Sequence, residues 1–162
     1  MVATFFVPTA EDLRHLLTRL FGKDVTVEEV PSPSGEVPAK PAVAALYCMD
    51  DGTPAAVTLC DPTLAAFRAA ALAMIPPTSA AEAVTNGVLD GSLLETLQEV
   101  CNVEARLFNM VGLPHVSLTR VFGRVSELPE EAAALLERPG GRIDFRVGIP
   151  SYGEGRMAVV TR

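Results

Sequence analysis

The sequence predicts an α+β fold with an antiparallel sheet and two long helices. Apolar residues recur every three or four positions over 13–21 and 93–111, as they do in amphipathic helices. Runs typical of strands, separated by short turn sequences, fill 42–60 and 143–161, which favours antiparallel hairpins. The chain has 162 residues, of which 49% are hydrophobic, so we expect a single domain over residues 1–162.

The first predicted helix begins after Thr9. Asp12 follows Thr9 by three residues, which is the capping-box pattern that satisfies free amides of a first helical turn. Gly22 is the expected stop, because glycine tolerates the left-handed backbone that ends many helices. Between them, one face of the helix carries the apolar residues Leu13, Leu16, Leu17, Leu20 and Phe21.

Three strands are expected in the first half of the chain. Residues 24–30 favour a strand, and 31–41 contain four prolines, which predict an extended loop within the domain. Residues 42–49 and 54–60 are two further β-like runs. The sequence Asp-Asp-Gly at 50–52 separates them and predicts a hairpin turn.

Two helices and a shorter one are expected next. An Asp-Pro pair opens a helix predicted over 61–75, because proline is well suited to a first helical position. A short helix is predicted over 79–86. Ser92 and Glu95 form a second capping-box pattern, which opens the longest predicted helix, 92–111.

The C-terminal part predicts a short helix over 128–137 and a final hairpin. Apolar residues alternate over 143–149 and again over 157–161, and a glycine-containing turn at 152–155 separates the two runs. This hairpin completes the antiparallel sheet.

Composition excludes several classes of protein. Thirteen Lys and Arg against 20 Asp and Glu give a net charge of −7, which disfavours nucleic acid as a partner. The longest apolar stretch, LAAFRAAALAMI, contains Arg68 and is too short to cross a membrane, and the N-terminus lacks a signal-peptide pattern. The three cysteines show no C-x-x-C spacing, so reduced thiols and a cytoplasmic location are expected.

Familiar catalytic motifs are missing. The sequence contains no nucleotide-binding glycine loop and no G-x-S-x-G motif. His15 and His115 are 100 positions apart without a third ligand, which disfavours zinc. Cys48, Cys60 and Cys101 lack a neighbouring histidine or lysine, so we expect them in the core. No metal and no cofactor is expected.

The polar face of the longest helix carries the candidate site. Glu95, Glu99, Asn102 and Arg106 fall together opposite the apolar face. A solvated helix surface is the simpler explanation for such charges. However, asparagine is a poor helix former, and its carboxamide can both donate and accept a hydrogen bond, as the positioning of a water requires. A glutamate one turn earlier can hold a cation of a docking partner.

Glu104 departs from this pattern, because it projects toward the apolar side of the helix. Two explanations remain open. Glu104 either reaches the surface at the edge of the helix, or is buried with a basic partner such as Arg120 or Arg124.

A family resemblance is carried by the segments LLETLQEVCNV and GLPHVSLTRVFG. They resemble the CheC/CheX/FliY phosphatases of bacterial chemotaxis, and single-site CheX-like members most closely. Members carry Glu-x-x-Asn on a long surface helix, which Glu99 and Asn102 match, followed by a Ser-Leu-Pro-Thr-Val strand, which residues 117–121 match. The order of elements agrees over nearly the whole chain, from the N-terminal helix with its FGKDV exit, through the hairpin that ends in LCD, to the motif helix.

The resemblance implies hydrolysis of the aspartyl phosphate on a CheY-type receiver domain. In that role Asn102 positions the attacking water and Glu99 pairs with a receiver lysine. The match is incomplete: Glu95 replaces an Asp or Ser, Thr119 replaces proline, and Arg106 replaces a small glycine. Glu95 and Arg106 are therefore candidate partner-binding residues, and Arg106 either hydrogen-bonds Asn102 or blocks docking.

The resemblance also implies a CheC-like fold, with the two long helices on one side of the sheet, and a homodimer. Three functions remain open. The first is a phosphatase that acts on a receiver domain of a response regulator. The second is a non-catalytic binding or scaffolding module of the same fold. The third is a small-molecule-binding domain with a pocket between sheet and helices.

Overall fold

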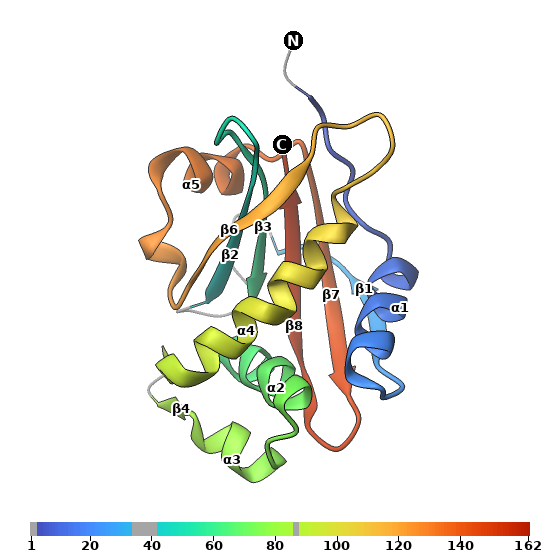
Figure 1. Cartoon of the computed structure of the whole chain (residues 1–162), viewed down its shortest axis with the longest axis vertical. Coiled ribbons are helices and arrows are strands. Elements are labelled where there is room, and N and C mark those ends of the chain that lie inside the picture. The colour runs from blue at the N-terminus through green and yellow to red at the C-terminus, as the bar shows by residue number, and fades with distance from the viewer. Residues whose placement is uncertain (1–2, 34–41, 86–87) are drawn as a thin grey trace.

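The computed structural model describes residues 3–33, 42–85 and 88–162, which form one main sheet and the helices around it (Figure 1). Six strands are arranged in the order β1-β7-β8-β3-β2-β6, and every neighbouring pair is antiparallel. The predicted antiparallel sheet is therefore confirmed. The strands are β1 (Thr26–Val30), β2 (Val43–Met49), β3 (Pro54–Cys60), β6 (Val116–Phe122), β7 (Gly141–Ile149) and β8 (Gly153–Thr161).

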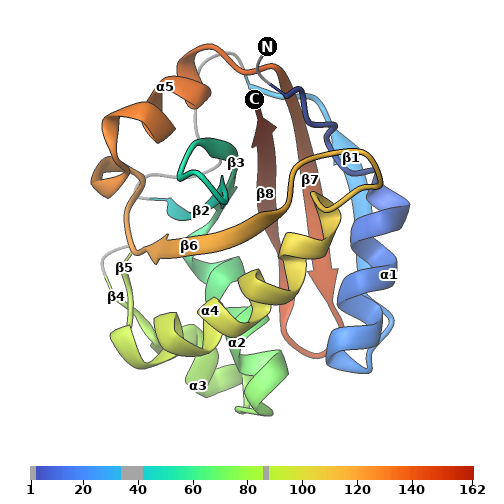
Figure 2. The same ribbon diagram turned by 45° about the horizontal axis from the view of Figure 1, so that its top comes forward.

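Helices cover both faces of this sheet. Three of them, α1 (Ala10–Phe21), α2 (Pro62–Ala73) and α4 (Gly91–Glu104), share one hydrophobic core with the first face. A shorter helix, α5 (Glu130–Glu137), packs on the opposite face in a second core and stands apart from the other three in Figure 2. The prediction of two long helices on one side is confirmed, while the covering of the second face was not predicted.

Strand β2 shows why the sheet needs two covers. Its alternate side chains enter different cores, one set with α1, α2 and α4 and the other with α5. Because both faces are buried, the strand is apolar at every position rather than at every second one. The first core receives Val43, Ala45 and Tyr47, and the second receives Ala44, Leu46 and Cys48.

The start of α4 differs from the prediction. The helix begins at Gly91, and its cap is Asp90, whose carboxylate accepts a hydrogen bond from the Ser92 amide at 2.9 Å. The predicted capping box of Ser92 with Glu95 is therefore wrong. In α1, by contrast, Thr9 and Asp12 form the predicted capping box with bonds of 3.1 and 3.2 Å.

The end of α4 is also earlier than predicted. The α-helix stops at Glu104 and a single 3₁₀ turn, η1 (Ala105–Leu107), follows, so the continuous helix over 92–111 is wrong. The cause is Asn109. Its carboxamide donates to the Ala105 carbonyl at 3.0 Å, and it pairs with both backbone groups of Val116 at 2.7 and 2.8 Å. These bonds turn the chain into β6 and leave Val111 fully exposed, although periodicity placed it on the apolar side.

Smaller differences occur elsewhere. The predicted helix over 79–86 is α3 (Pro77–Glu82), followed by a two-stranded ribbon of β4 (Val84–Thr85) and β5 (Val88–Leu89), with residues 86–87 outside the described ranges. Of the predicted loop over 31–41, residues 34–41 also lie outside them. The turn of the final hairpin lies at 150–152 rather than 152–155. None of the helices in the described ranges has the length and apolar character needed to span a lipid bilayer.

Candidate functional site

Helix α4 presents one buried face and one exposed face, as predicted. Leu97 and Val100 are completely buried, and Leu107 in η1 is buried as well. Glu99 and Asn102 lie on the opposite face and are exposed. The apolar side chains therefore fix the rotation of the helix, and this rotation directs the Glu-x-x-Asn pair outward.

The exposed face of α4 borders a shallow depression of about 330 Å³. Its walls are Glu95, Gln98, Glu99 and Asn102 from α4 and Leu118 from β6. In the described ranges, none of the side chains of Glu95, Glu99 and Asn102 is hydrogen-bonded or ion-paired within the chain. Two carboxylates and one carboxamide thus face solvent with their bonding capacity unused. Such a set can hold a cation and orient a water molecule.

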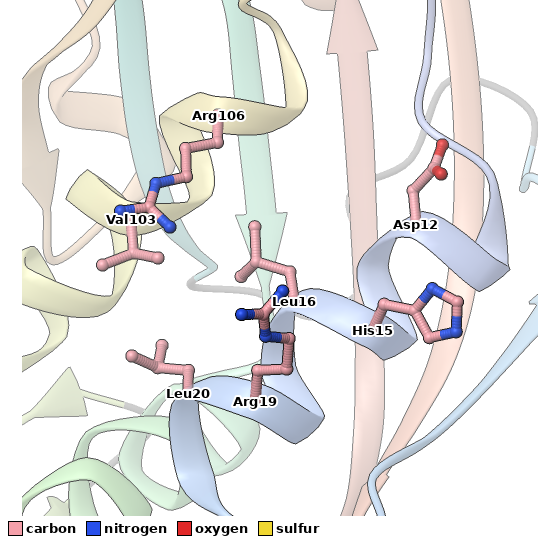
Figure 3. A pocket seen from close by; sticks show the side chains of 7 residues that line it. All are labelled: Asp12, His15, Leu16, Arg19, Leu20, Val103 and Arg106. Carbon is pink, nitrogen blue, oxygen red and sulfur yellow. The ribbon is translucent and has the colours of Figure 1, made fainter.

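Arg106 lies outside this depression. It belongs to η1, and its side chain extends into a separate groove between α4 and α1 (Figure 3). Among the residues that the structure describes, Arg106 forms no hydrogen bond with Asn102, so that alternative for Arg106 is wrong. Glu95, Glu99 and Asn102 are therefore brought together, and Arg106 is separated from them.

Two residues of the depression were missed by the sequence analysis. Gln98 lies one turn before Asn102 on the same face, a spacing that could have identified it. Leu118 could not be placed beside the site from spacing alone, because its position depends on the packing of β6 against α4.

A buried ion pair connects α4 to α2. Glu104 is completely buried and pairs with Arg68 of α2, which is 1% exposed. This corrects the predicted partners, Arg120 and Arg124, which are both exposed. Burial raises the pKa of Glu104, and the Arg68 guanidinium beside it acts in the opposite direction. Because Glu104 is two residues from Asn102, the pair anchors the segment of α4 that carries the site.

A hydrogen bond and an aromatic contact reinforce this anchor. The Tyr47 hydroxyl donates a hydrogen bond to the Cys101 carbonyl at 2.8 Å, and the ring centroids of Tyr47 and Phe108 lie 5.0 Å apart. Burial raises the pKa values of Cys60 and Cys101 to about 12, which keeps both thiols protonated at neutral pH. Their predicted place in the core is confirmed, as is that of Cys48.

The two histidines lie in separate surface pairs. His15 Nε2 is 3.0 Å from a Glu11 carboxylate oxygen on α1, and His115 Nδ1 is 3.1 Å from an Asp50 carboxylate oxygen in the turn after β2. Over the residues that the structure describes, no three His, Cys, Asp or Glu side chains are grouped so that they could hold a metal ion.

Comparison by sequence is uninformative, whereas comparison by structure is not. No protein-family model matches the chain, and no curated protein matches it. A chain of the FliG–FliM complex from H. pylori is similar over 94% of this chain and 85% of that one, with a TM-score of 0.60 and 13% identity. FliY of Thermotoga maritima is similar over 91% and 81%, with a TM-score of 0.51 and 14% identity.

A third similar structure is the CheX–CheY–BeF₃–Mg²⁺ complex from Borrelia burgdorferi. The similarity covers 91% of this chain and 91% of that one, with a TM-score of 0.51 and 12% identity. Together with the antiparallel sheet and the exposed motif helix, these likenesses establish the architecture. The chain has the fold of the CheC/CheX/FliY family.

Proposed function

We propose that this protein is a CheX-like phosphatase that hydrolyses the aspartyl phosphate of a CheY-type receiver domain. The observation that carries the proposal is the pairing of Glu99 and Asn102 on one exposed face of α4, beside an open depression. Cytoplasmic location and a homodimer are part of the same proposal, which draws on the sequence resemblance. The fold of a CheX protein bound to CheY is consistent with it.

The proposed chemistry needs only positioning. Hydrolysis requires a water held in line with the bond between phosphorus and the aspartyl oxygen, and a carboxamide can hold that water through its donor and acceptor atoms. Asn102 is suited to this because its own chain does not engage its carboxamide. Glu99, one turn earlier, accepts a hydrogen bond from a receiver lysine and fixes the orientation of the complex.

Glu95 continues the acidic row by one further turn. It is exposed and lines the same depression, so it adds a second carboxylate for cationic groups of the receiver. Its effect is on association rather than on the chemical step, because it lies two turns from Asn102. A partner-binding role for Glu95 is therefore included in the proposal.

A second candidate is a non-catalytic binding module that uses the same face of α4. The specific support is the similarity to a chain of the FliG–FliM complex, in which the fold takes part in a protein assembly. The sequence departures at Glu95, Arg106 and Thr119 also favour this alternative. Both candidates require the exposed polar face of α4. They differ in whether phosphate is released from the bound receiver.

Measurement of phosphate loss separates the two candidates. Each receiver domain encoded by the source organism is phosphorylated with a small-molecule phosphodonor, and its dephosphorylation is followed with and without this protein. We expect a cognate receiver to lose phosphate faster, and Asn102→Ala to reduce this acceleration by on the order of 10²-fold. Glu99→Ala weakens association instead.

Glu131→Ala on the opposite face is the matched control, since it removes an exposed helical side chain away from the site. No acceleration with any receiver would refute the phosphatase. Binding of a receiver without acceleration would support the binding module.

A further inference from the structure

A second surface feature lies between α1 and α4, away from the Glu-x-x-Asn face. In Figures 1 and 2 the C-terminal end of α4 approaches α1 in both views. The space between them holds a groove of about 490 Å³, whose apolar floor is formed by Leu16, Leu20 and Val103. An adjoining depression of about 320 Å³ extends the groove along η1 past Leu107 and Met110. We name these two depressions together the α1–α4 groove.

Two arginines border the apolar floor. Arg19 rises from α1 and Arg106 extends from η1, both into the space between the helices (Figure 3). Both are exposed, and within the described ranges neither forms an ion pair. Asp12 and His15 also line the groove, where the Asp12 carboxylate accepts a hydrogen bond from the Thr9 amide and His15 pairs with Glu11. Two guanidinium groups thus stand against one carboxylate of the lining. The facing charge of the groove is therefore positive.

This local charge opposes the charge of the chain. The protein as a whole carries a net charge of −7, yet the α1–α4 groove presents two unpaired guanidinium groups over an apolar floor. A guanidinium forms its strongest contacts with planar carboxylates, which it can bind through two parallel hydrogen bonds. The surface thus combines an apolar strip with two anion-binding groups.

We propose that the α1–α4 groove binds an acidic amphipathic helix of a partner protein. The apolar stripe of that helix covers Leu16, Leu20 and Val103, and carboxylates on its flanks meet Arg19 and Arg106. Helix α1 has 12 residues and is therefore about 18 Å long, which accommodates roughly three turns of a helix lying beside it. This contact does not depend on phosphatase activity, because the groove is separate from the Asn102 depression.

The chemistry of the groove favours a helix over other anions. A nucleic acid would meet the repulsion of the net charge of −7 and would leave the apolar floor uncovered. A small anion would pair with the arginines but would bury little apolar surface. A helix whose apolar side chains lie at i, i+3, i+4 and i+7 satisfies both parts of the groove at once.

A designed peptide tests this proposal directly. The probe is an 18-residue, fluorescein-labelled peptide with leucine at i, i+3, i+4 and i+7 positions and glutamate at the flanking ones, titrated with the full chain by fluorescence anisotropy. A second peptide carries lysine in place of every glutamate. We expect the acidic peptide to bind with a dissociation constant on the order of 10–100 μM and the basic peptide to bind at least tenfold more weakly.

Matched charge reversals locate the contact. The test variant is Arg19→Glu with Arg106→Glu, and the control is Arg124→Glu with Arg138→Glu, two exposed arginines outside the groove. The two variants have the same net charge. We expect the test variant to weaken acidic-peptide binding at least tenfold and the control to change it less than threefold. If the test variant does not fold, Arg19→Gln and Arg106→Gln replace it, each with an expected loss of at least threefold.

Three results would overturn the proposal. The first is no binding of the acidic peptide at 1 mM protein, and the second is equal loss of binding in the test and control variants. The third is a wild-type dimer, detected by sedimentation velocity, that only the test variant dissociates, because the occupant of the groove would then be a second copy of this chain. If the wild-type protein accelerates dephosphorylation of none of the receivers but still binds the acidic peptide, only the phosphatase proposal is refuted.

Discussion

The buried Arg68–Glu104 pair allows a quantitative prediction about the helix that carries the candidate site. Replacing Glu104 by leucine leaves the Arg68 guanidinium in the core without its partner, and that group is 1% exposed. Arginine cannot escape the cost by losing its proton. Removal of one partner of a buried pair costs about 3–5 kcal/mol, so Glu104→Leu should lower the free energy of unfolding by that amount.

The opposite single change behaves differently. Arg68→Met leaves a buried carboxyl group. Burial already raises the pKa of Glu104 above its usual value of 4.5 while the Arg68 guanidinium opposes it, and removal of that guanidinium raises the pKa further. A raised folded-state pKa means that the native state holds its proton more tightly than the unfolded state, so stability is present at low pH and is lost as pH rises above 4.5. Arg68→Met should therefore regain stability on acidification, whereas Glu104→Leu should lack this pH-dependent gain from position 104.

Urea denaturation of both single variants and of the double variant Arg68→Met with Glu104→Leu gives the measurement. The double variant replaces the pair by apolar side chains and should lie within about 1–2 kcal/mol of the wild type, because replacement of a whole buried pair is often neutral. The double-mutant cycle built from the four free energies of unfolding should show strong coupling between positions 68 and 104. Single changes that each cost less than 1 kcal/mol, or a double variant that costs the sum of both, would refute the reasoning.

Three further predictions concern α4. Leu97→Ala should cost roughly 2–5 kcal/mol in chemical denaturation, because Leu97 is completely buried; a cost below 1 kcal/mol would contradict its place in the core. Asn109→Ala should cost roughly 1–3 kcal/mol, since it leaves both backbone groups of Val116 without their partner, and near-neutral stability would show that the end of the helix is held in another way. Asp90→Ala should lower the melting temperature at pH 7 relative to wild type. Hydrogen bonds from Ser92 lower the pKa of Asp90 below 3.8, so the stabilisation by this cap should fade as pH falls below 3.8 through that lowered value, and a wild-type-to-variant difference that persists at pH 2 would argue against the cap.

Much of the fold follows from local chemistry that the sequence displays. The capping box of Thr9 with Asp12 and the positive φ of 66° at Gly22 lie where the sequence predicts them, because each depends only on residues one turn away. The exposure of Glu99 and Asn102 also follows from the 3.6-residue period of α4. Local sequence signals therefore determined where most of the strands and helices lie, and the helical period determined the face on which the candidate site lies.

Other features were decided only by contacts between separate helices and strands. Helix α4 ends early because Asn109 bonds to β6, and Glu104 is buried because α2 brings Arg68 beneath it. A helical projection places Arg106 in line with Asn102, yet the 3₁₀ turn and the neighbouring α1 turn it into a different groove. Sequence periodicity reports which side of a helix is apolar, but the packing of helix against helix determines what each polar side chain meets. The physical reason is that such contacts join different helices and strands, as Arg68 and Glu104 do across 36 positions of the chain, and the period of one helix carries no information about its neighbours.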